Sequence, residues 1–196
     1  MCLPIYDADE KLHQRIMLTP WWSDTDKVVA SVKLSYHKNI FLATYSVQEP
    51  QLRRMCTHFN DEVYKDSCVE VFLQKTGCQE YMNFEFSASG FCHVAKGTSR
   101  EGRESLPKKL LEAIPVEVKV LENNTERSLW TLSVQLDLCK FGLLLENEKL
   151  QGKTILGNFF CCGDGLAEPH YLSYAQIDTL KPDFHVPSSF VPLEFV

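Results

Sequence analysis

The chain has 196 residues, a formal net charge of −6, 44% hydrophobic residues and 23% charged residues. This composition is ordinary for a globular protein with a full core. The scattered lysines and arginines exclude a concentrated basic face for nucleic acid or an anionic membrane, and the longest apolar run is too short for a membrane span. The N-terminus lacks signal-peptide features and the eight cysteines are too few for a disulfide scaffold. We therefore expect one reduced, cytoplasmic domain over residues 1–196, with no nucleic-acid or membrane partner.

Alternating apolar and polar residues predict a chain made almost entirely of short strands. Residues 1–26 read as irregular, with a helical turn or an edge strand over 9–16 and a loop over 23–26. Short helices are predicted over 108–113 and over 137–145, the second with Asp137 as its N-cap. The strands are predicted over 28–36, 40–47, 66–73, 81–89, 91–95, 116–121, 128–136, 154–161 and 190–196.

Short strands at close spacing, joined by hairpin turns, are typical of an all-β sandwich or barrel. Polar loops over 51–65 and 96–109 and a long tail over 166–192 separate the strands. Loops of this kind on a rigid sheet often carry function. We predict an antiparallel β-sandwich with long loops and very little helix.

The hairpin over 66–89 has a register that follows from its pattern. Each strand has one apolar face, and both apolar faces must be buried on the same side of the sheet. This requires Val71 opposite Phe84 and therefore places Glu70 opposite Glu85 on the other side. Like charges on directly opposed positions repel. The pair needs an arginine, a metal ion, a shared proton or a polar ligand to compensate it.

Two interpretations of the Glu70/Glu85 pair remain open at this stage. Two carboxylates about 5 Å apart have the spacing of a retaining glycosidase. Alternatively, Arg100 or Arg103 neutralises the pair within a sugar-binding or a purely structural network. No other feature of the sequence marks the pair as catalytic.

Residues 161–164 (Cys-Cys-Gly-Asp) together with His170 suggest a metal site at first sight. Zinc sites usually show paired ligands at a spacing of two to four residues, and a second pair is absent here. The sequence also contains no Gly-x-Ser-x-Gly motif and no Gly-rich loop for phosphate. We therefore predict neither a metal site nor a cofactor from these residues.

An ordered set of motifs runs along the chain over 64–72, 81–86, 97–100, 130–132, 157–164, 169–173 and 182–185. From about residue 20 to the end, this set resembles the family 9 carbohydrate-binding modules, in their compact bacterial branch. The resemblance implies a jelly-roll-related β-sandwich of the DOMON-like group. It implies binding of glucan or xylan chain ends in association with glycoside hydrolases and polysaccharide breakdown, and it allows a structural calcium ion.

The resemblance also implies a site. Tyr64 occupies the position of an aromatic clamp residue that is tryptophan in sugar-binding members, and a tyrosine can still stack on a sugar ring. The remaining expected carbohydrate-binding residues hydrogen-bond hydroxyl groups, hold the shape of the site or line its rim: Asp66, Asn83, Glu85, Arg100, Asp164 and His170.

We expect a module that binds carbohydrate without catalysis. One alternative is a glycoside hydrolase that uses Glu70 and Glu85. Another is a degenerate module with a structural or protein-interaction role, in which the face around Tyr64 is filled by the protein's own side chains.

Overall fold

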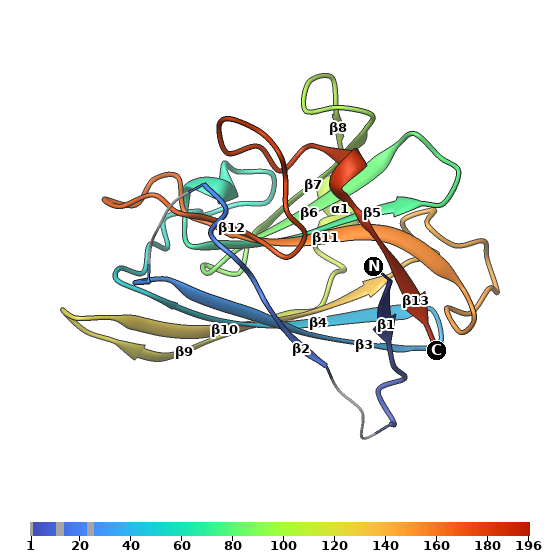
Figure 1. Cartoon of the computed structure of the whole chain (residues 1–196), viewed down its shortest axis with the longest axis horizontal. Coiled ribbons are helices and arrows are strands. Elements are labelled where there is room, and N and C mark those ends of the chain that lie inside the picture. The colour runs from blue at the N-terminus through green and yellow to red at the C-terminus, as the bar shows by residue number, and fades with distance from the viewer. Residues whose placement is uncertain (1, 11–13, 23–25) are drawn as a thin grey trace.

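The computed structural model describes residues 2–10, 14–22 and 26–196. Within these ranges two β-sheets pack face to face, which confirms the predicted β-sandwich (Figure 1). The larger sheet has the strand order β1-β13-β11-β5-β6-β7-β8, with β12 paired to β11, and the smaller sheet has the order β2-β3-β4-β10-β9. Neighbouring strands are antiparallel except β1 and β13, which are parallel.

The strands have the following bounds. The larger sheet contains β1 (Leu3–Ile5), β5 (Cys68–Lys75), β6 (Tyr81–Ser87), β7 (Cys92–Gly97), β8 (Glu104–Ser105), β11 (Thr154–Cys162), β12 (Tyr171–Ser173) and β13 (Val191–Phe195). The smaller sheet contains β2 (Arg15–Met17), β3 (Val29–His37), β4 (Ile40–Glu49), β9 (Val116–Asn123) and β10 (Ser128–Asp137).

The register predicted for the central hairpin is confirmed. In the β5–β6 pair, Glu70 lies opposite Glu85 and Val71 lies opposite Phe84. The apolar face packs into the core between the two sheets, where Trp130 is also fully buried. A shift of one residue would have exposed this apolar set, which explains why alternation alone could fix the register.

The outer face of β5 and β6 is buried as well. Loops and the C-terminal segment cover it, and a second apolar cluster forms there. The ring of Phe184 stacks on Phe160 with centroids 4.3 Å apart, and Phe190 packs edge-on against Phe72. These aromatic contacts attach the C-terminal segment to the sheet.

Some predicted elements differ from the structure. The helix over 108–113 is confirmed as α1 (Lys108–Leu111), and two short 3-10 helices occur at η1 (Val63–Lys65) and η2 (Pro187–Ser189). The helix over 137–145 is wrong. Asp137 ends β10 and accepts a hydrogen bond from Asn39 Nδ2 at 2.6 Å, and the chain then turns through Gly142, whose φ is +71°.

The N-terminal segment is more regular than predicted, because β1 and β2 are built by pairing with distant strands. The prediction for 9–16 falls partly on residues outside the described ranges, and its described end enters the edge strand β2. The loop predicted over 23–26 also lies almost wholly outside them. None of the helices in the described part of the chain is long and apolar enough to cross a membrane.

Candidate functional site

A cavity of about 730 Å³ opens on the outer face of the larger sheet. Its floor is made by outward-facing side chains of β5, β6, β7 and β11. Its walls come from three loop segments, over 60–64, 100–103 and 181–185. These four strands are consecutive neighbours in the sheet, so the floor is rigid while the walls belong to loops.

The two facing carboxylates lie at the floor of this cavity. Glu70 is 3% exposed and Glu85 is 5% exposed. Glu85 Oε1 accepts a hydrogen bond from Asn83 Nδ2 at 2.8 Å and lies 3.5 Å from Nη1 of Arg103. Glu70 Oε1 accepts a hydrogen bond from Cys162 Sγ at 3.2 Å. The structure thus places a cation beside Glu85 and a thiol beside Glu70.

Burial and mutual repulsion separate the protonation states of this pair. Burial, followed by the charge of Glu85, raises the pKa of Glu70 well above its usual value. Burial also raises the pKa of Glu85, but Arg103 and the hydrogen bond from Asn83 oppose this rise. Glu85 is therefore the better stabilised carboxylate of a pair that titrates together, and Glu70 is the one whose charge is less favourable.

Two histidines complete the polar lining. His93 on β7 is directly opposite Glu85, and His185 Nδ1 lies 2.8 Å from the hydroxyl of Tyr81. Burial, with Arg103 nearby, lowers the pKa of His93 to about 4 and that of His185 to about 3. Both rings are therefore neutral at pH 7, and each has one donor and one acceptor nitrogen, although Tyr81 already occupies Nδ1 of His185.

Aromatic rings form part of the wall. Tyr64 on η1 is half-buried at the cavity, and its hydroxyl donates to Glu62 Oε1 at 2.8 Å. Tyr171 and Phe184 line the same cavity. The cavity therefore combines apolar ring surface with neutral and charged hydrogen-bonding groups.

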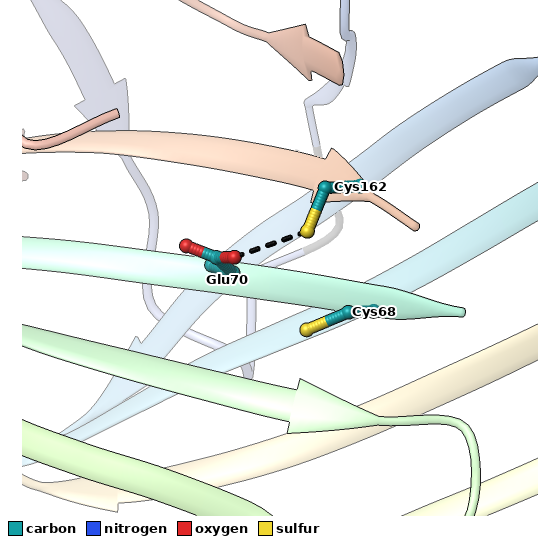
Figure 2. A group of neighbouring side chains, drawn as sticks. All are labelled: Cys68, Glu70 and Cys162. Carbon is teal, nitrogen blue, oxygen red and sulfur yellow. Dashed lines mark hydrogen bonds between the residues drawn. The ribbon is translucent and has the colours of Figure 1, made fainter. Parts of the chain in front are cut away.

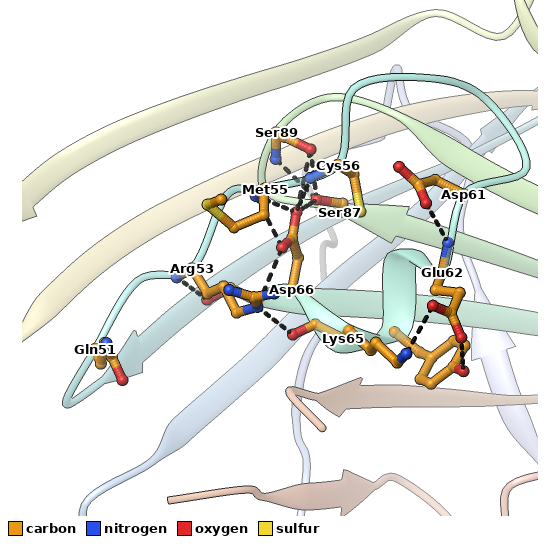
Figure 3. Close-up of polar contacts among 12 residues, drawn as sticks. Gln51, Arg53, Met55, Cys56, Asp61, Glu62, Lys65, Asp66, Ser87 and Ser89 are labelled. Carbon is orange, nitrogen blue, oxygen red and sulfur yellow. Dashed lines mark hydrogen bonds and ion pairs between the residues drawn. The ribbon is translucent and has the colours of Figure 1, made fainter. Parts of the chain in front are cut away.

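Asp66 lies outside the cavity lining and binds the protein's own loop instead (Figure 3). Its carboxylate accepts hydrogen bonds from the backbone N–H groups of Met55 and Cys56, at 2.8 and 2.9 Å, and from Ser87 Oγ at 2.7 Å. Arg53 Nε is 3.6 Å away. Asp66 thus ties the loop before η1 to the end of β6 and holds the shape of the region that carries Tyr64.

The other predicted site residues have three different placements. Glu85, Arg100 and Asp164 line the cavity together with Tyr64. Asn83 is fully buried beneath it and reaches the site through Glu85. His170 lies elsewhere.

His170 is 2% exposed and sits near the inward-facing residues of β11. Its Nε2 lies 3.6 Å from Glu49 Oε2 and 3.8 Å from Cys161 Sγ. Burial lowers the pKa of His170 to about 4. Cys161 and Cys162 are consecutive in a strand and therefore face opposite sides of the sheet. His170 contacts Cys161 on the inner side, whereas the cavity lies on the side of Cys162, so His170 does not line the cavity.

Sequence reasoning left the choice of compensating arginine open, and it missed the role of His93. Arg103 pairs with Glu85, whereas Arg100 Nη1 pairs with Asp183 Oδ1 at 3.5 Å across the cavity mouth. Alternation in β7 could have placed His93 beside Glu85, since its neighbours Cys92 and Val94 face the core. The contact between Arg100 and Asp183 joins two loops that are distant in sequence, so the local sequence pattern of neither loop predicts it.

The calcium ion that the resemblance allows needs a suitable set of ligands. Calcium takes six to eight oxygen ligands. In the described residues two groups of three side chains could hold a metal ion, Cys68/Glu70/Cys162 and Asp7/Asp9/His37, and each contains a cysteine or a histidine. Asp66 directs its oxygens to N–H and O–H donors. These residues do not fit calcium.

Residues 5–195 match the sequence pattern of carbohydrate-binding family 9. The match spans nearly the whole chain, and the chain belongs to this family. A search of curated proteins found no match.

Solved structures agree with this assignment. One solved structure is of a Bacteroides uniformis protein to which carbohydrate binding is assigned by inference. It is 28% identical to this chain, with a TM-score of 0.82 over 94% of this chain and 86% of that one. A family 9 module from Caldicellulosiruptor kristjanssonii in complex with cellotriose is 11% identical, with a TM-score of 0.65 over 100% and 93%. A family 9 module from the same organism with glucose is 14% identical, with a TM-score of 0.57 over 98% and 95%. The last two likenesses show the shared fold.

Proposed function

We propose that the outer-face cavity binds a glucan- or xylan-type oligosaccharide or chain end, without catalysing a reaction, in the context of polysaccharide breakdown. The observation that carries the proposal is the pairing of the Tyr64 ring with a fixed polar floor in one open cavity. Family membership supports the ligand class. The modules of the same fold that hold cellotriose and glucose support a glucose-based ligand.

The chemistry of the cavity suits a sugar. Tyr64 presents an aromatic face to the C–H groups of a pyranose ring. Glu85 accepts hydrogen bonds from hydroxyl groups, and Arg103 donates to them. Neutral His93 can donate and accept hydrogen bonds, and His185 can do one or the other through Nε2, because its Nδ1 contacts Tyr81. Because Asn83 and the β-sheet fix the floor, little ordering is needed when a ligand binds.

The cavity beside Tyr64 is also relevant to the degenerate-module alternative. That alternative expects the protein's own side chains to fill this face. Instead, a volume of about 730 Å³ is open there, which is large enough for a small ligand. The open cavity supports binding over a purely structural role.

Calorimetric titration with gluco- and xylo-oligosaccharides tests the proposal. We expect saturable binding, with Tyr64→Ala weakening it by roughly tenfold or more because the stacking surface is lost. Trp21→Ala is the matched control, since Trp21 is an exposed aromatic residue, 40% accessible, outside the cavity lining. It should leave the affinity unchanged. Absence of binding to every oligosaccharide, or equal losses in both variants, would contradict the proposal.

A glycoside hydrolase is the second candidate, favoured by one observation. Glu70 and Glu85 face each other at the floor with different surroundings, and an acid and a base are separated in this way in glycosidases. Turnover of nitrophenyl glycosides that disappears in Glu70→Gln would establish it. Sugar binding with no turnover in the wild-type chain supports the non-catalytic proposal.

A further inference from the structure

A second group of chemically active side chains lies at the edge of the cavity floor. Cys162 on β11 and Cys68 on β5 are directly opposite each other in the antiparallel pair. Both belong to the apolar cluster on the outer face of the sheet. Glu70 follows Cys68 by two residues on β5 and therefore lies on the same face. Figure 2 shows the three side chains converging from these two strands.

The three ligand atoms are close enough to share one ion. Cys68 Sγ, Cys162 Sγ and a carboxylate oxygen of Glu70 all lie within 4.8 Å of one another. Around a tetrahedral zinc ion, bond lengths near 2.3 Å to sulfur and 2.1 Å to oxygen separate two sulfurs by about 3.8 Å and a sulfur and an oxygen by about 3.6 Å. The distance between Cys162 Sγ and Glu70 Oε1 is 3.2 Å, slightly shorter than the separation of about 3.6 Å expected for a sulfur and an oxygen on one zinc ion. Side-chain rotations on a fixed sheet could complete the geometry.

The surroundings favour a bound cation. Cys68 is 0%, Cys162 2% and Glu70 3% exposed, so all three groups are removed from bulk water. Among the described ion pairs, Arg103 contacts Glu85 rather than Glu70. A divalent ion would therefore neutralise Glu70, the carboxylate of the pair that forms no ion pair with Arg103.

We propose that Cys68, Glu70 and Cys162 form a site for a thiophilic divalent metal ion of the zinc class. Glu70 and Cys162 line the cavity, and Cys68 lies behind them. The fourth coordination position therefore faces the cavity, where water or a ligand oxygen can occupy it. A site with three protein ligands and one open position has the arrangement found when zinc contacts small molecules.

This site goes beyond both the sequence expectation and the proposed carbohydrate function. The sequence suggested metal ligands around the adjacent pair Cys161 and Cys162, and it gave a metal ion as one of four ways to compensate the Glu70/Glu85 pair. Consecutive strand residues face opposite sides, so this pair cannot chelate one ion. The partner of Cys162 is Cys68, which is far away in sequence and is brought opposite by strand pairing alone.

Titration of the reduced, chelator-treated full chain with Co²⁺ tests the proposal without any sugar. Tetrahedral cobalt with thiolate ligands gives intense visible bands and a thiolate-to-metal charge-transfer band. We expect both bands to saturate at one ion per chain, and we expect Zn²⁺ to displace Co²⁺ and remove the visible bands.

Variants locate the site. Cys162→Ser and Cys68→Ser should each remove the charge-transfer band or weaken Co²⁺ binding at least tenfold, and Glu70→Gln should weaken it. Cys161→Ser is the matched control, since it is the adjacent buried cysteine on the other face of β11, and it should retain binding. Circular dichroism identifies any variant that fails to fold. If a serine variant does not fold, the single variants Cys68→Ala and Cys162→Ala replace Cys68→Ser and Cys162→Ser.

Several outcomes would overturn the proposal. The first is an absence of saturable binding to the reduced wild-type chain. The second is binding that survives loss of both cysteines but disappears in His37→Ala, which would assign it to the Asp7/Asp9/His37 group. The third is a Cys68–Cys162 disulfide that persists under reducing conditions, detected by mass spectrometry. Because no sugar is present, failure here is distinct from failure of the carbohydrate titrations.

Discussion

Asp66 and Glu70 are buried carboxylates four residues apart, but their surroundings are opposite in kind. Asp66 accepts hydrogen bonds from two backbone N–H groups and a serine hydroxyl. Glu70 accepts one from a thiol and faces a second carboxylate. Burial raises the pKa of Asp66, but the Cys56 and Met55 amides and the Ser87 hydroxyl outweigh this effect and leave it below its usual value. The pKa of Glu70 is raised well above its usual value.

The comparison shows how burial acts on a carboxylate. Where donors are built around the group, the charge is stabilised and the residue holds the structure together. Where donors are missing, the charge is unfavourable and the group remains available to a proton, an ion or a ligand. By this criterion Asp66 is a structural residue next to the cavity, and Glu70 belongs to the chemistry of its floor.

The largest effect is expected for Asp66→Ala. Removing this carboxylate leaves buried backbone N–H groups without acceptors, which should lower the free energy of unfolding by about 3–4 kcal/mol. Because the folded pKa of Asp66 is depressed, its contribution is present above the ordinary value of 3.8 and is lost as the pH falls through the folded pKa. Denaturant unfolding measures the loss, and Asp61→Ala, in the same loop but partly exposed, should cost far less.

A smaller effect is expected for Arg103→Met. The substitution leaves Glu85 without its cation, so unfolding free energy at pH 8 should fall by about 2 kcal/mol. The second substitution Glu85→Gln should restore most of this loss. Arg100→Met is the control, because that side chain is 61% exposed and should change stability by less than about 0.5 kcal/mol. Equal effects of the two arginine variants would contradict the assignment of Arg103 to Glu85.

The smallest effect is expected for Glu70→Gln in the metal-free chain, where it should be stabilising. The folded pKa of Glu70 is raised, so the wild-type chain loses stability as the pH rises above the ordinary value of 4.5. The variant should lack this loss and be about 1 kcal/mol more stable at pH 8, with the difference vanishing near pH 4. Unfolding curves across this pH range measure it. A destabilised variant at pH 8 would place Glu70 with Asp66 as a structural residue.

The register of the central hairpin was predictable because it depends only on residues that are close together in the sequence. Alternation defined two faces, burial fixed the register, and the register placed Glu70 opposite Glu85. Of the predicted site residues in the hairpin or directly before it, Tyr64 and Glu85 line the cavity, whereas Asn83 lies beneath it and Asp66 lies outside it.

The remainder depends on contacts between segments that are distant in sequence. Asp66 was predicted as a site residue, and only the fold shows that its carboxylate accepts hydrogen bonds from the backbone amides of Met55 and Cys56. His170 reads like part of the cavity rim, but it packs against Glu49 in the interior. Similarly, Cys68 meets Cys162 only through the pairing of β5 and β11.

The most direct test of the central claim is a crystal structure of the chain grown with a glucan oligosaccharide. The account predicts one sugar ring against Tyr64 and hydroxyl groups within hydrogen-bonding distance of Glu85 and Arg103, while Asp66 keeps its backbone partners. A sugar bound at another surface, or one whose hydroxyl groups displace the loop amides from Asp66, would contradict it.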